Sequence, residues 1–273
     1  MYETYWQLQQ KPFENTADPR FYYPGESHQA ALLKLRYAVE NRRGGALLTG
    51  PSGSGKTLLT GMLRVVLGAD YSPFIHLVFP QMSTAELLAY LADEFDGGGN
   101  AANNPGVQVS IRRIERFLAA NGDKGRHAVL VIDEAHLLDD NHTFEALRLL
   151  LNFESGGRPA LTLLLSGQPA ILPTLDRLPA WEERLGVKCL LRPFNEEETA
   201  GYVEHRLRVA GARRTIVEPE ALSTLHALTH GIARQINRLG DLALLIGFAE
   251  ERRTLSADHF ESVCRELVAV APE

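Results

Sequence analysis

The segment Gly50-Pro51-Ser52-Gly53-Ser54-Gly55-Lys56-Thr57 decides the fold of this 273-residue chain. It fits the pattern G-x-x-x-x-G-K-[ST], in which glycines let successive backbone N–H groups surround phosphate oxygens at the start of a helix. The pattern requires a strand before it and a helix after it, and the sequence predicts a strand over 45–49 and a helix over 58–67. We therefore predict a phosphate-binding loop made of Gly50, Pro51, Ser52, Gly53, Ser54, Gly55, Lys56, Thr57 and Leu58.

The loop predicts a nucleotide site, and a second motif supplies its acidic half. Lys56 is expected to reach the β- and γ-phosphate oxygens, and the Thr57 hydroxyl to bind Mg²⁺. The apolar run 129–132 predicts a buried strand that places Asp133 at its carboxyl end, where it can hold Mg²⁺ through a water molecule. Glu134 projects differently and is expected to polarise a water for attack on the γ-phosphate. An acidic pair at the end of a strand could also cap the following helix, but next to a phosphate loop we interpret it as part of a site that hydrolyses nucleotide.

Two further patterns follow the acidic pair. Asp133-Glu134-Ala135-His136 is also the signature of one helicase superfamily, but such helicases need a second α/β domain, and the residues after 193 are predicted to be helical. The fourth predicted strand ends in Ser166-Gly167-Gln168, beside Asp133 in the sheet. We assign the γ-phosphate sensor to Gln168 rather than Ser166, with a plain turn before Pro169 as the alternative.

Alternation of strands and helices predicts the architecture. Short apolar runs are typical of parallel strands buried on both faces, at 45–49, 74–79, 128–132, 161–165 and 187–191. Helices are predicted at 27–42, from a capping box at Ser83 with Glu86, at 143–153, and after 193 at 196–210 (capped by Asn195 with Glu198), 219–229, 234–250 and 256–269. We predict an aromatic-rich leader and first helix packed on the ATPase core (1–43), a P-loop α/β core with helices on both sides of the sheet (44–193) and a small all-α lid (194–273).

Composition narrows the class of protein. The formal net charge is −6, so no global electrostatic attraction to nucleic acid or anionic membrane is expected. No stretch approaches the roughly 18 apolar residues of a membrane helix, and no secretory signal begins the chain. Cys189 and Cys264 are far apart and predicted to be buried apolar residues. Stretch 97–106 is rich in Gly and Asn and is predicted to be a mobile loop. We expect a soluble protein of a reducing compartment.

Further motifs lie along nearly the whole chain. They are Lys11-Pro12-Phe13, Asp18-Pro19-Arg20-Phe21-Tyr22, Ser27-His28, Asp133-Glu134-Ala135, Leu147-Arg148-Leu149-Leu150 with Asn152 and Glu154, Gly167-Gln168-Pro169, Glu198-Thr199, Tyr202, His205-Arg206-Leu207, Ala210-Gly211, Gly231, Arg234 and Ile236-Asn237. In combination these motifs resemble the AAA+ ATPases of the general secretion pathway protein A (ExeA) family. Ala233 departs from that family, which usually has proline there.

This resemblance implies roles that the spacing alone does not. It implies that Arg184 acts on the γ-phosphate of a neighbouring subunit, with Arg177 as the alternative, so that hydrolysis requires a homo-oligomer. It implies that Arg234 contacts phosphate within its own subunit. It also places residues 20–23 near the adenine, although their rings are equally suited to packing in a core. Larger family members continue into a membrane segment and a peptidoglycan-binding region; we expect these parts to be absent or to belong to another protein.

Three functions compete at this stage. The first is an ATP-driven assembly switch of the secretion-associated type, cytoplasmic or held at the inner membrane through a protein partner of the secretion or envelope-assembly system. The second is an ATP-dependent DNA-binding regulator resembling transposition ATPases, which basic pairs favour. The third is a nucleotide-gated scaffold without hydrolysis. The basic groups are Arg42-Arg43, Arg112-Arg113 with Arg116, Arg213-Arg214 and Arg252-Arg253.

Overall fold

The computed structural model describes residues 1–97, 106–138 and 141–269. Most of the stretch 97–106, predicted to be a mobile loop, lies outside the described residues. The chain divides into two compact units, which we call the sheet unit and the helical unit. The sheet unit comprises Ala30–Gly50 and Leu59–Leu191. The helical unit comprises Met1–Gln29, Pro51–Leu58 and Arg192–Glu273.

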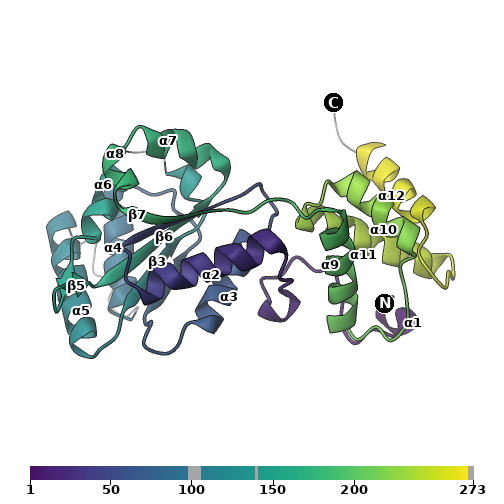
Figure 1. The fold of residues 1–273 in the computed structure, drawn as a ribbon, viewed down its shortest axis with the longest axis horizontal. Coiled ribbons are helices and arrows are strands. Elements are labelled where there is room, and N and C mark those ends of the chain that lie inside the picture. Colours follow the sequence, from purple (N-terminus) through teal and green to yellow (C-terminus); the bar gives the residue numbers. More distant parts are fainter. Residues whose placement is uncertain (98–105, 139–140, 270–273) are drawn as a thin grey trace. The chain divides into compact units, whose positions relative to one another are not determined.

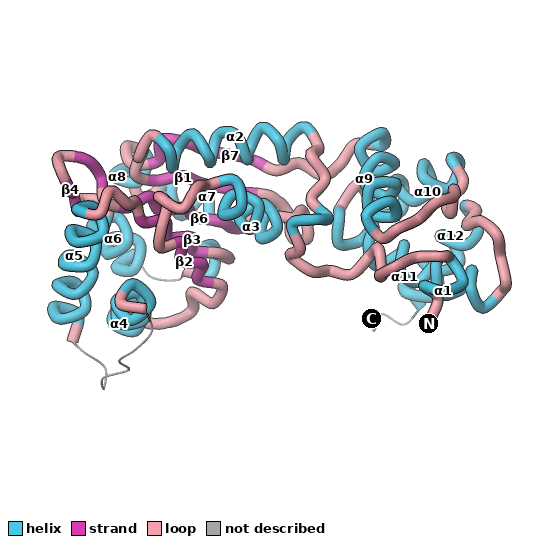
Figure 2. The backbone as a smooth tube through the Cα atoms, turned by 90° about the horizontal axis from the view of Figure 1, so that it is seen from below, coloured by secondary structure: helices cyan, strands magenta, loops and turns pink. Residues whose placement is uncertain are grey.

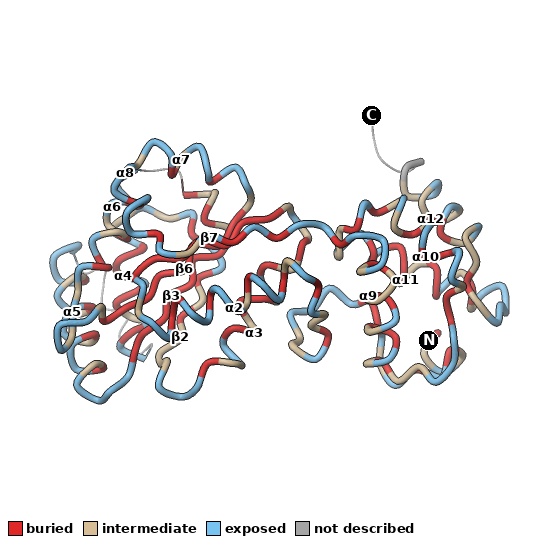
Figure 3. Tube along the Cα trace, in the orientation of Figure 1, coloured by how far each residue is buried: buried red, intermediate tan, exposed pale blue. Residues whose placement is uncertain are grey.

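The sheet unit is built on five parallel strands in the order β2-β3-β6-β1-β7 (Figure 1). Every residue of the three inner strands is buried, as their largely apolar sequences predict (Figure 3). The edge strands β2 and β7 are only partly buried, contrary to prediction, because each has a neighbour on one side only. The strands are β1 (Gly45–Thr49), β2 (Phe74–Leu77), β3 (Ala128–Ile132), β6 (Leu161–Gly167) and β7 (Leu185–Leu190).

Helices cover both faces of this sheet. Alternate residues of a strand point to opposite faces, so strands that are apolar on both faces need a packing partner on each side. Leu47, Leu130 and Leu163 belong to one core with side chains of α4, α5 and α6. On the other face, the Cys189 thiol lies 3.9 Å from the carbonyl oxygen of Ala31 in α2. The elements around the sheet are α2 (Glu26–Glu40), α3 (Lys56–Val66), α4 (Thr84–Phe95), α5 (Val107–Asp123), η2 (Ala135–Leu137), α6 (Asn141–Leu150), the hairpin β4 (Glu154–Ser155) and β5 (Arg158–Pro159), η3 (Pro169–Ile171), α7 (Leu172–Asp176) and α8 (Pro179–Glu182).

Some predicted elements of the α/β part agree with the observed ones, and others differ. β1 and β3 have the predicted bounds, and the predicted capping box before α4 is confirmed, since the Ser83 N–H donates to the Glu86 carboxylate (2.9 Å) and the Glu86 N–H to the Ser83 hydroxyl (3.3 Å). The strand predicted over 74–79 ends at Leu77. The helix predicted over 143–153 corresponds to α6 and ends at Leu150, and the strand predicted over 187–191 corresponds to β7 and begins at Leu185. Helices α5, α7 and α8 and the hairpin of β4 and β5 were not predicted.

In the described part of the chain, four helices of the helical unit follow the sheet, and Figure 2 shows them joined by loops. The Asn195 capping box of the first helix is confirmed, because the Glu198 N–H donates to the Asn195 side chain at 2.8 Å and the Asn195 N–H to the Glu198 carboxylate at 2.9 Å. All four lie within one residue of the predicted bounds. They are α9 (Glu196–Val209), α10 (Pro219–Thr229), α11 (Ala233–Ala249) and α12 (Ala257–Ala269).

The start of the leader packs with these helices and not on the ATPase core, where we expected it. This leader contains α1 (Glu3–Trp6) and η1 (Pro19–Phe21). Trp6 is fully buried in the same apolar cluster as α9–α12, and its indole N–H donates to the Leu244 carbonyl of α11 (2.9 Å). A large ring that also needs a hydrogen-bond acceptor is matched better by this helix than by a purely apolar surface.

A buried arginine joins the leader to α9. Arg206 is 2% exposed, and its guanidinium donates to the carbonyls of Pro12 and Glu14 and to the hydroxyl of Tyr202. The charge also lies 4.3 Å from the centre of the Phe21 ring. The planar guanidinium thus links several leader residues to one helix.

Three remaining expectations concern the cysteines and membrane helices. Cys189 is buried as predicted, whereas Cys264 is only half-buried. Within the described ranges, no helix has the length and apolar character needed to cross a bilayer.

We predict that Arg206→Met lowers the free energy of unfolding by about 2–4 kcal/mol, because buried carbonyls would lose their donor. Urea unfolding measures this change. Arg208→Met is the matched control, since Arg208 is exposed on the same helix, and it should change stability by no more than about 0.5 kcal/mol. Equal effects of the two substitutions would contradict the linking role of Arg206.

Candidate functional site

The phosphate-loop segment forms a tight turn before α3. Gly53 and Gly55 have φ values of +77° and +92°, a region that favours glycine. The Ser54 N–H donates to the Pro51 carbonyl (3.3 Å), and the Lys56 ammonium donates to the same oxygen (3.0 Å). Lys56 itself is 5% exposed at the first residue of α3. The motif therefore adopts the left-handed glycine turns that a nest of N–H groups requires.

Arg234 lies against this loop. Its backbone N–H, in the first turn of α11, donates to the Gly53 carbonyl at 3.1 Å. A Cβ on Gly53 would come within 2.7 Å of the Arg234 Cβ, so only glycine fits there. The arginine that the family resemblance assigns to phosphate contact is thus beside the loop, and its side chain is exposed.

His28 is a loop contact that residue patterns did not identify. Its Nε2 lies 2.8 Å from the Ser54 carbonyl oxygen, and the side chain is buried. Burial lowers the pKa of this imidazole. The only sequence signal was the Ser27-His28 pair of the family leader, to which no role had been assigned.

Asp133 is the centre of a polar network at the carboxyl end of β3. It is 1% exposed, and its Oδ1 accepts hydrogen bonds from the Ser166 hydroxyl (2.8 Å) and the Glu134 N–H (3.0 Å). Its Oδ2 lies 3.3 Å from Nε2 of His76 in β2. Parallel pairing explains the meeting, because Ser166 on β6 is level with Asp133. Ser166, which we ranked below Gln168, is therefore a direct neighbour of Asp133.

Glu134 has an unusual backbone conformation. Its φ of 49° and ψ of 35° lie in the left-handed region, which costs a non-glycine residue free energy and is concentrated at functional sites. Its carboxylate lies 3.4 Å from Nδ1 of His136, a nitrogen that also accepts the Gln168 N–H (3.3 Å). Glu134 and Gln168 thus contact the same imidazole.

Arg184 lies at the amino ends of the strands, whereas Asp133 lies at their carboxyl ends. Arg184 precedes β7, and its carbonyl accepts the Gly45 N–H at the start of β1 (3.0 Å). The strand registers separate its backbone from Asp133 by four residues of rise and three strand spacings, on the order of 20 Å. The exposed guanidinium donates to the Asn152 side chain (2.7 Å). Arg177, the alternative, is also exposed after α7.

The leader residues linked to adenine by resemblance are engaged in packing. Arg20 pairs with Asp18 (2.6 Å), and Phe21 is buried against Arg206. Tyr23 packs edge-on against the rings of Phe194 and Tyr202.

A glycine-rich loop after the inner parallel strand β1, with an acidic pair at the carboxyl end of β3, which β6 separates from β1, defines the P-loop fold of nucleoside triphosphatases. Residues 39–175 match the family described as "AAA domain", and the chain belongs to that family. The AAA+ fold, a parallel sheet flanked by helices and followed by further helices, was predicted from the sequence and is confirmed.

Comparison with curated proteins also confirms the resemblance. The chain is 34% identical over 252 residues to General secretion pathway protein A of Aeromonas hydrophila. The match covers 91% of this chain and 45% of that protein, so the chain spans less than half of the relative's length.

Solved structures share the fold at low sequence identity. Aeropyrum pernix ORC2 has a TM-score of 0.72 at 16% identity, with 97% of this chain and 73% of that chain covered. Cdc6p of Pyrobaculum aerophilum gives 0.70 at 14% identity, covering 96% and 74%. The Thermotoga maritima branch-migration motor RuvB gives 0.60 at 17% identity, covering 88% and 69%.

Proposed function

We propose that the chain binds ATP with Mg²⁺ at residues 50–58 and hydrolyses it to ADP and phosphate. The observation that carries this proposal is the left-handed glycine turn that leads from a buried strand into α3. The Ser54 hydroxyl supports it, because this loop oxygen is buried and has no hydrogen-bond partner among the described residues. A ligand in the loop would supply that partner.

The acidic pair fits the second half of the site. Asp133 and Thr57 offer the carboxylate and hydroxyl oxygens that Mg²⁺ prefers, and the ion would neutralise charge on the phosphates. Glu134 takes a proton from the attacking water while the water oxygen bonds to the γ-phosphorus. The bond between the γ-phosphorus and the bridging oxygen breaks at the same time, and ADP leaves with that oxygen. Lys56 holds the β- and γ-phosphates, and Gln168, with Ser166 as the alternative, senses the γ-phosphate. Arg234 contacts the phosphates from the same subunit.

Glu134→Gln tests this mechanism. The amide cannot accept the proton, so we expect phosphate release to fall at least a hundredfold while ATP affinity stays within about threefold of wild type. Phosphate release and equilibrium nucleotide binding are the two measurements. Glu145→Gln, an exposed carboxylate on α6, is the control, and normal turnover by Glu134→Gln would refute the role of Glu134.

The position of Arg184 supports a role on a second subunit. It lies on the order of 20 Å from Asp133 of its own chain, further than one arginine side chain can span. The same group is exposed and held by Asn152, as a residue that meets a neighbour would be. We therefore propose a homo-oligomer in which Arg184 stabilises transition-state charge in the adjacent site.

Mixing two inactive variants tests this arrangement. Arg184→Ala and Glu134→Gln should each be inactive alone, whereas a mixture should recover a substantial fraction of wild-type activity, because an intact Glu134 meets an intact Arg184 at some interfaces. Phosphate release measures the recovery. Arg177→Ala should remain active alone; if it is inactive and Arg184→Ala is not, the trans role passes to Arg177. A wild type that stays monomeric at all nucleotide states would refute the oligomer.

The biological role we propose is an assembly switch. ATP locks the subunits together and hydrolysis releases them, driving a protein partner of a secretion or envelope-assembly system. Similarity to General secretion pathway protein A supports this role. On the same basis we propose a cytoplasmic location, with attachment to the inner membrane through that partner.

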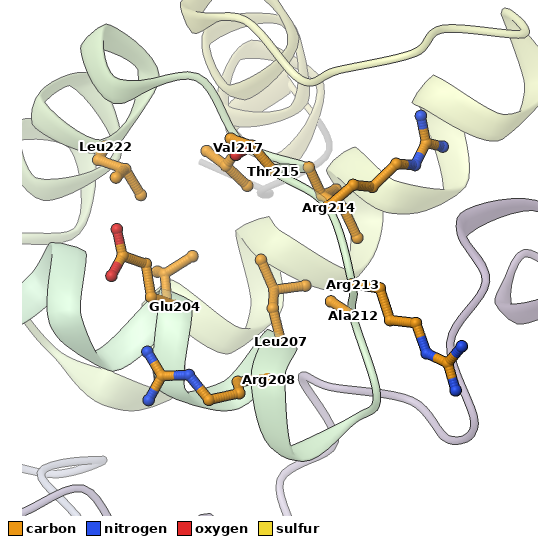
Figure 4. Close-up of a pocket in the computed structure, with 11 residues that line it drawn as sticks. Glu204, Leu207, Arg208, Ala212, Arg213, Arg214, Thr215, Val217 and Leu222 are labelled. Carbon is orange, nitrogen blue, oxygen red and sulfur yellow. The ribbon is translucent and has the colours of Figure 1, made fainter.

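A second candidate, DNA binding, is favoured by a groove in the helical unit. The cavity measures about 370 Å³ and lies between α9, α10 and the loop that joins them (Figure 4). Arg208 and Arg213 line it without an ion pair among the described residues, and Arg214 donates to the Arg253 carbonyl (3.2 Å). Among the solved relatives, Aeropyrum pernix ORC1 is described in complex with DNA.

This second function predicts salt-dependent binding of a DNA duplex. Affinity should fall steeply between 50 and 200 mM salt, roughly, and Arg213→Glu with Arg214→Glu should weaken binding about tenfold or more at low salt. Fluorescence anisotropy with a labelled duplex measures both effects. Arg36→Glu with Arg158→Glu removes the same charge from exposed sites elsewhere, and equal losses in the two double variants would reject the groove as the binding site.

A further inference from the structure

His28 has a position that the proposed function leaves unexplained. It lies in the first turn of α2 and is 5% exposed. Its ring centre is 4.9 Å from that of Phe194, and its Nδ1 lies 3.4 Å from the Ser27 hydroxyl. The remaining nitrogen, Nε2, lies 2.8 Å from the Ser54 carbonyl oxygen. The ring thus contacts Phe194 and Ser27, and its Nε2 faces the phosphate loop.

The partners of the ring define its protonation. A carbonyl oxygen can only accept, so Nε2 carries the proton and donates to Ser54. Burial lowers the pKa of the imidazole, which disfavours a second proton on the ring. In the tautomer with its proton on Nε2, Nδ1 can accept a hydrogen bond from the Ser27 hydroxyl, 3.4 Å away.

This hydrogen bond orients a peptide group of the loop. In a trans peptide the C=O of one residue and the N–H of the next point in opposite directions. With the Ser54 carbonyl turned toward His28, the Gly55 N–H points away from His28. In the same way, the Arg234 N–H donates to the Gly53 carbonyl and fixes the direction of that carbonyl. Two carbonyl oxygens, which would repel phosphate, are thus held on the outer side of the turn.

We propose that His28 is a positioning residue for the phosphate loop: its Nε2–H holds the Ser54 carbonyl outward so that the Gly55 N–H is available to the phosphates of a nucleoside triphosphate. This inference rests on the proposed nucleotide binding at residues 50–58. It extends that function because the orientation of the ring is set by Phe194, at the start of the lid.

The lid contact is itself tightly constrained. The Phe194 N–H donates to the Gly231 carbonyl (2.9 Å), and a Cβ on Gly231 would lie 1.9 Å from the Phe194 carbonyl oxygen. Glu198 of α9 accepts the Glu26 N–H at the start of α2 (2.6 Å). The segment that carries His28 and the segment that carries Arg234 are therefore joined through Phe194 and Gly231 within one compact unit.

A matched pair of variants tests the donor. Glutamine carries its amide nitrogen the same number of bonds from Cβ as Nε2 of histidine, whereas the amide of asparagine is one bond too short. We expect His28→Gln to bind a fluorescent methylanthraniloyl ATP with Mg²⁺ as wild type does. His28→Asn and His28→Phe should bind it about five- to tenfold more weakly, the loss of one hydrogen bond. Phenylalanine keeps the stacking on Phe194, so a shared loss follows the donor and not the packing.

The outcomes are distinguishable. Wild-type affinity in all three variants, or equal losses including His28→Gln, would overturn the positioning role. Failure of wild type to bind, or unchanged binding by Lys56→Ala, would refute the proposed function instead. If a variant does not fold, long-range ¹⁵N–¹H NMR of the wild-type ring decides the point, since a proton found on Nδ1 rather than Nε2 would overturn the assignment.

Discussion

Parallel pairing of β1 with β6, and of β6 with β3, is the interaction on which the candidate site depends. It brings the end of β1, from which the phosphate loop starts, to the same sheet edge as Asp133 and Ser166. The same pairing places the residue before β7 at the opposite edge. One hydrogen-bonding pattern thus brings Asp133 and Ser166 together and keeps Arg184 away from them, and this separation is the basis of the role in trans that we propose for Arg184.

The buried inner strands made the fold predictable, whereas the end of the edge strand β2 and the packing of the leader were harder to predict. β1 and β3 are inner strands whose residues are all buried, so their largely apolar sequence pattern was enough to predict their bounds. Val78 and Phe79 extend the apolar pattern of β2 but are 59% and 63% exposed, because an edge strand near its end has no partner to bury them. Composition cannot distinguish such residues from a continued strand. The leader presented the same difficulty, since seven aromatic rings need a core but do not specify which one.

The site was predictable only where a residue acts through its own motif. The loop glycines, Lys56 and Asp133 were identified because phosphate and metal chemistry restrict their type and spacing. Ser166 and His76 act through their distance to Asp133, which the registers of neighbouring strands determine. His28 lies 26 positions before Ser54 in the sequence, and a side chain that holds a backbone carbonyl imposes no local pattern.

These indirect contacts connect the leader, the lid and the phosphate loop within the helical unit. The leader is tied to α9 through Arg206, and α9 is tied to the start of α2 through Glu198. The phosphate-loop residues belong to the same unit, with two of their carbonyls bonded to it. Because a packed unit shifts between discrete arrangements and does not deform continuously, a rearrangement of the lid would alter the directions of the loop N–H groups. Any binding event that shifted the packing of the lid would then be thermodynamically linked to nucleotide binding at the loop, each changing the affinity for the other by the same factor.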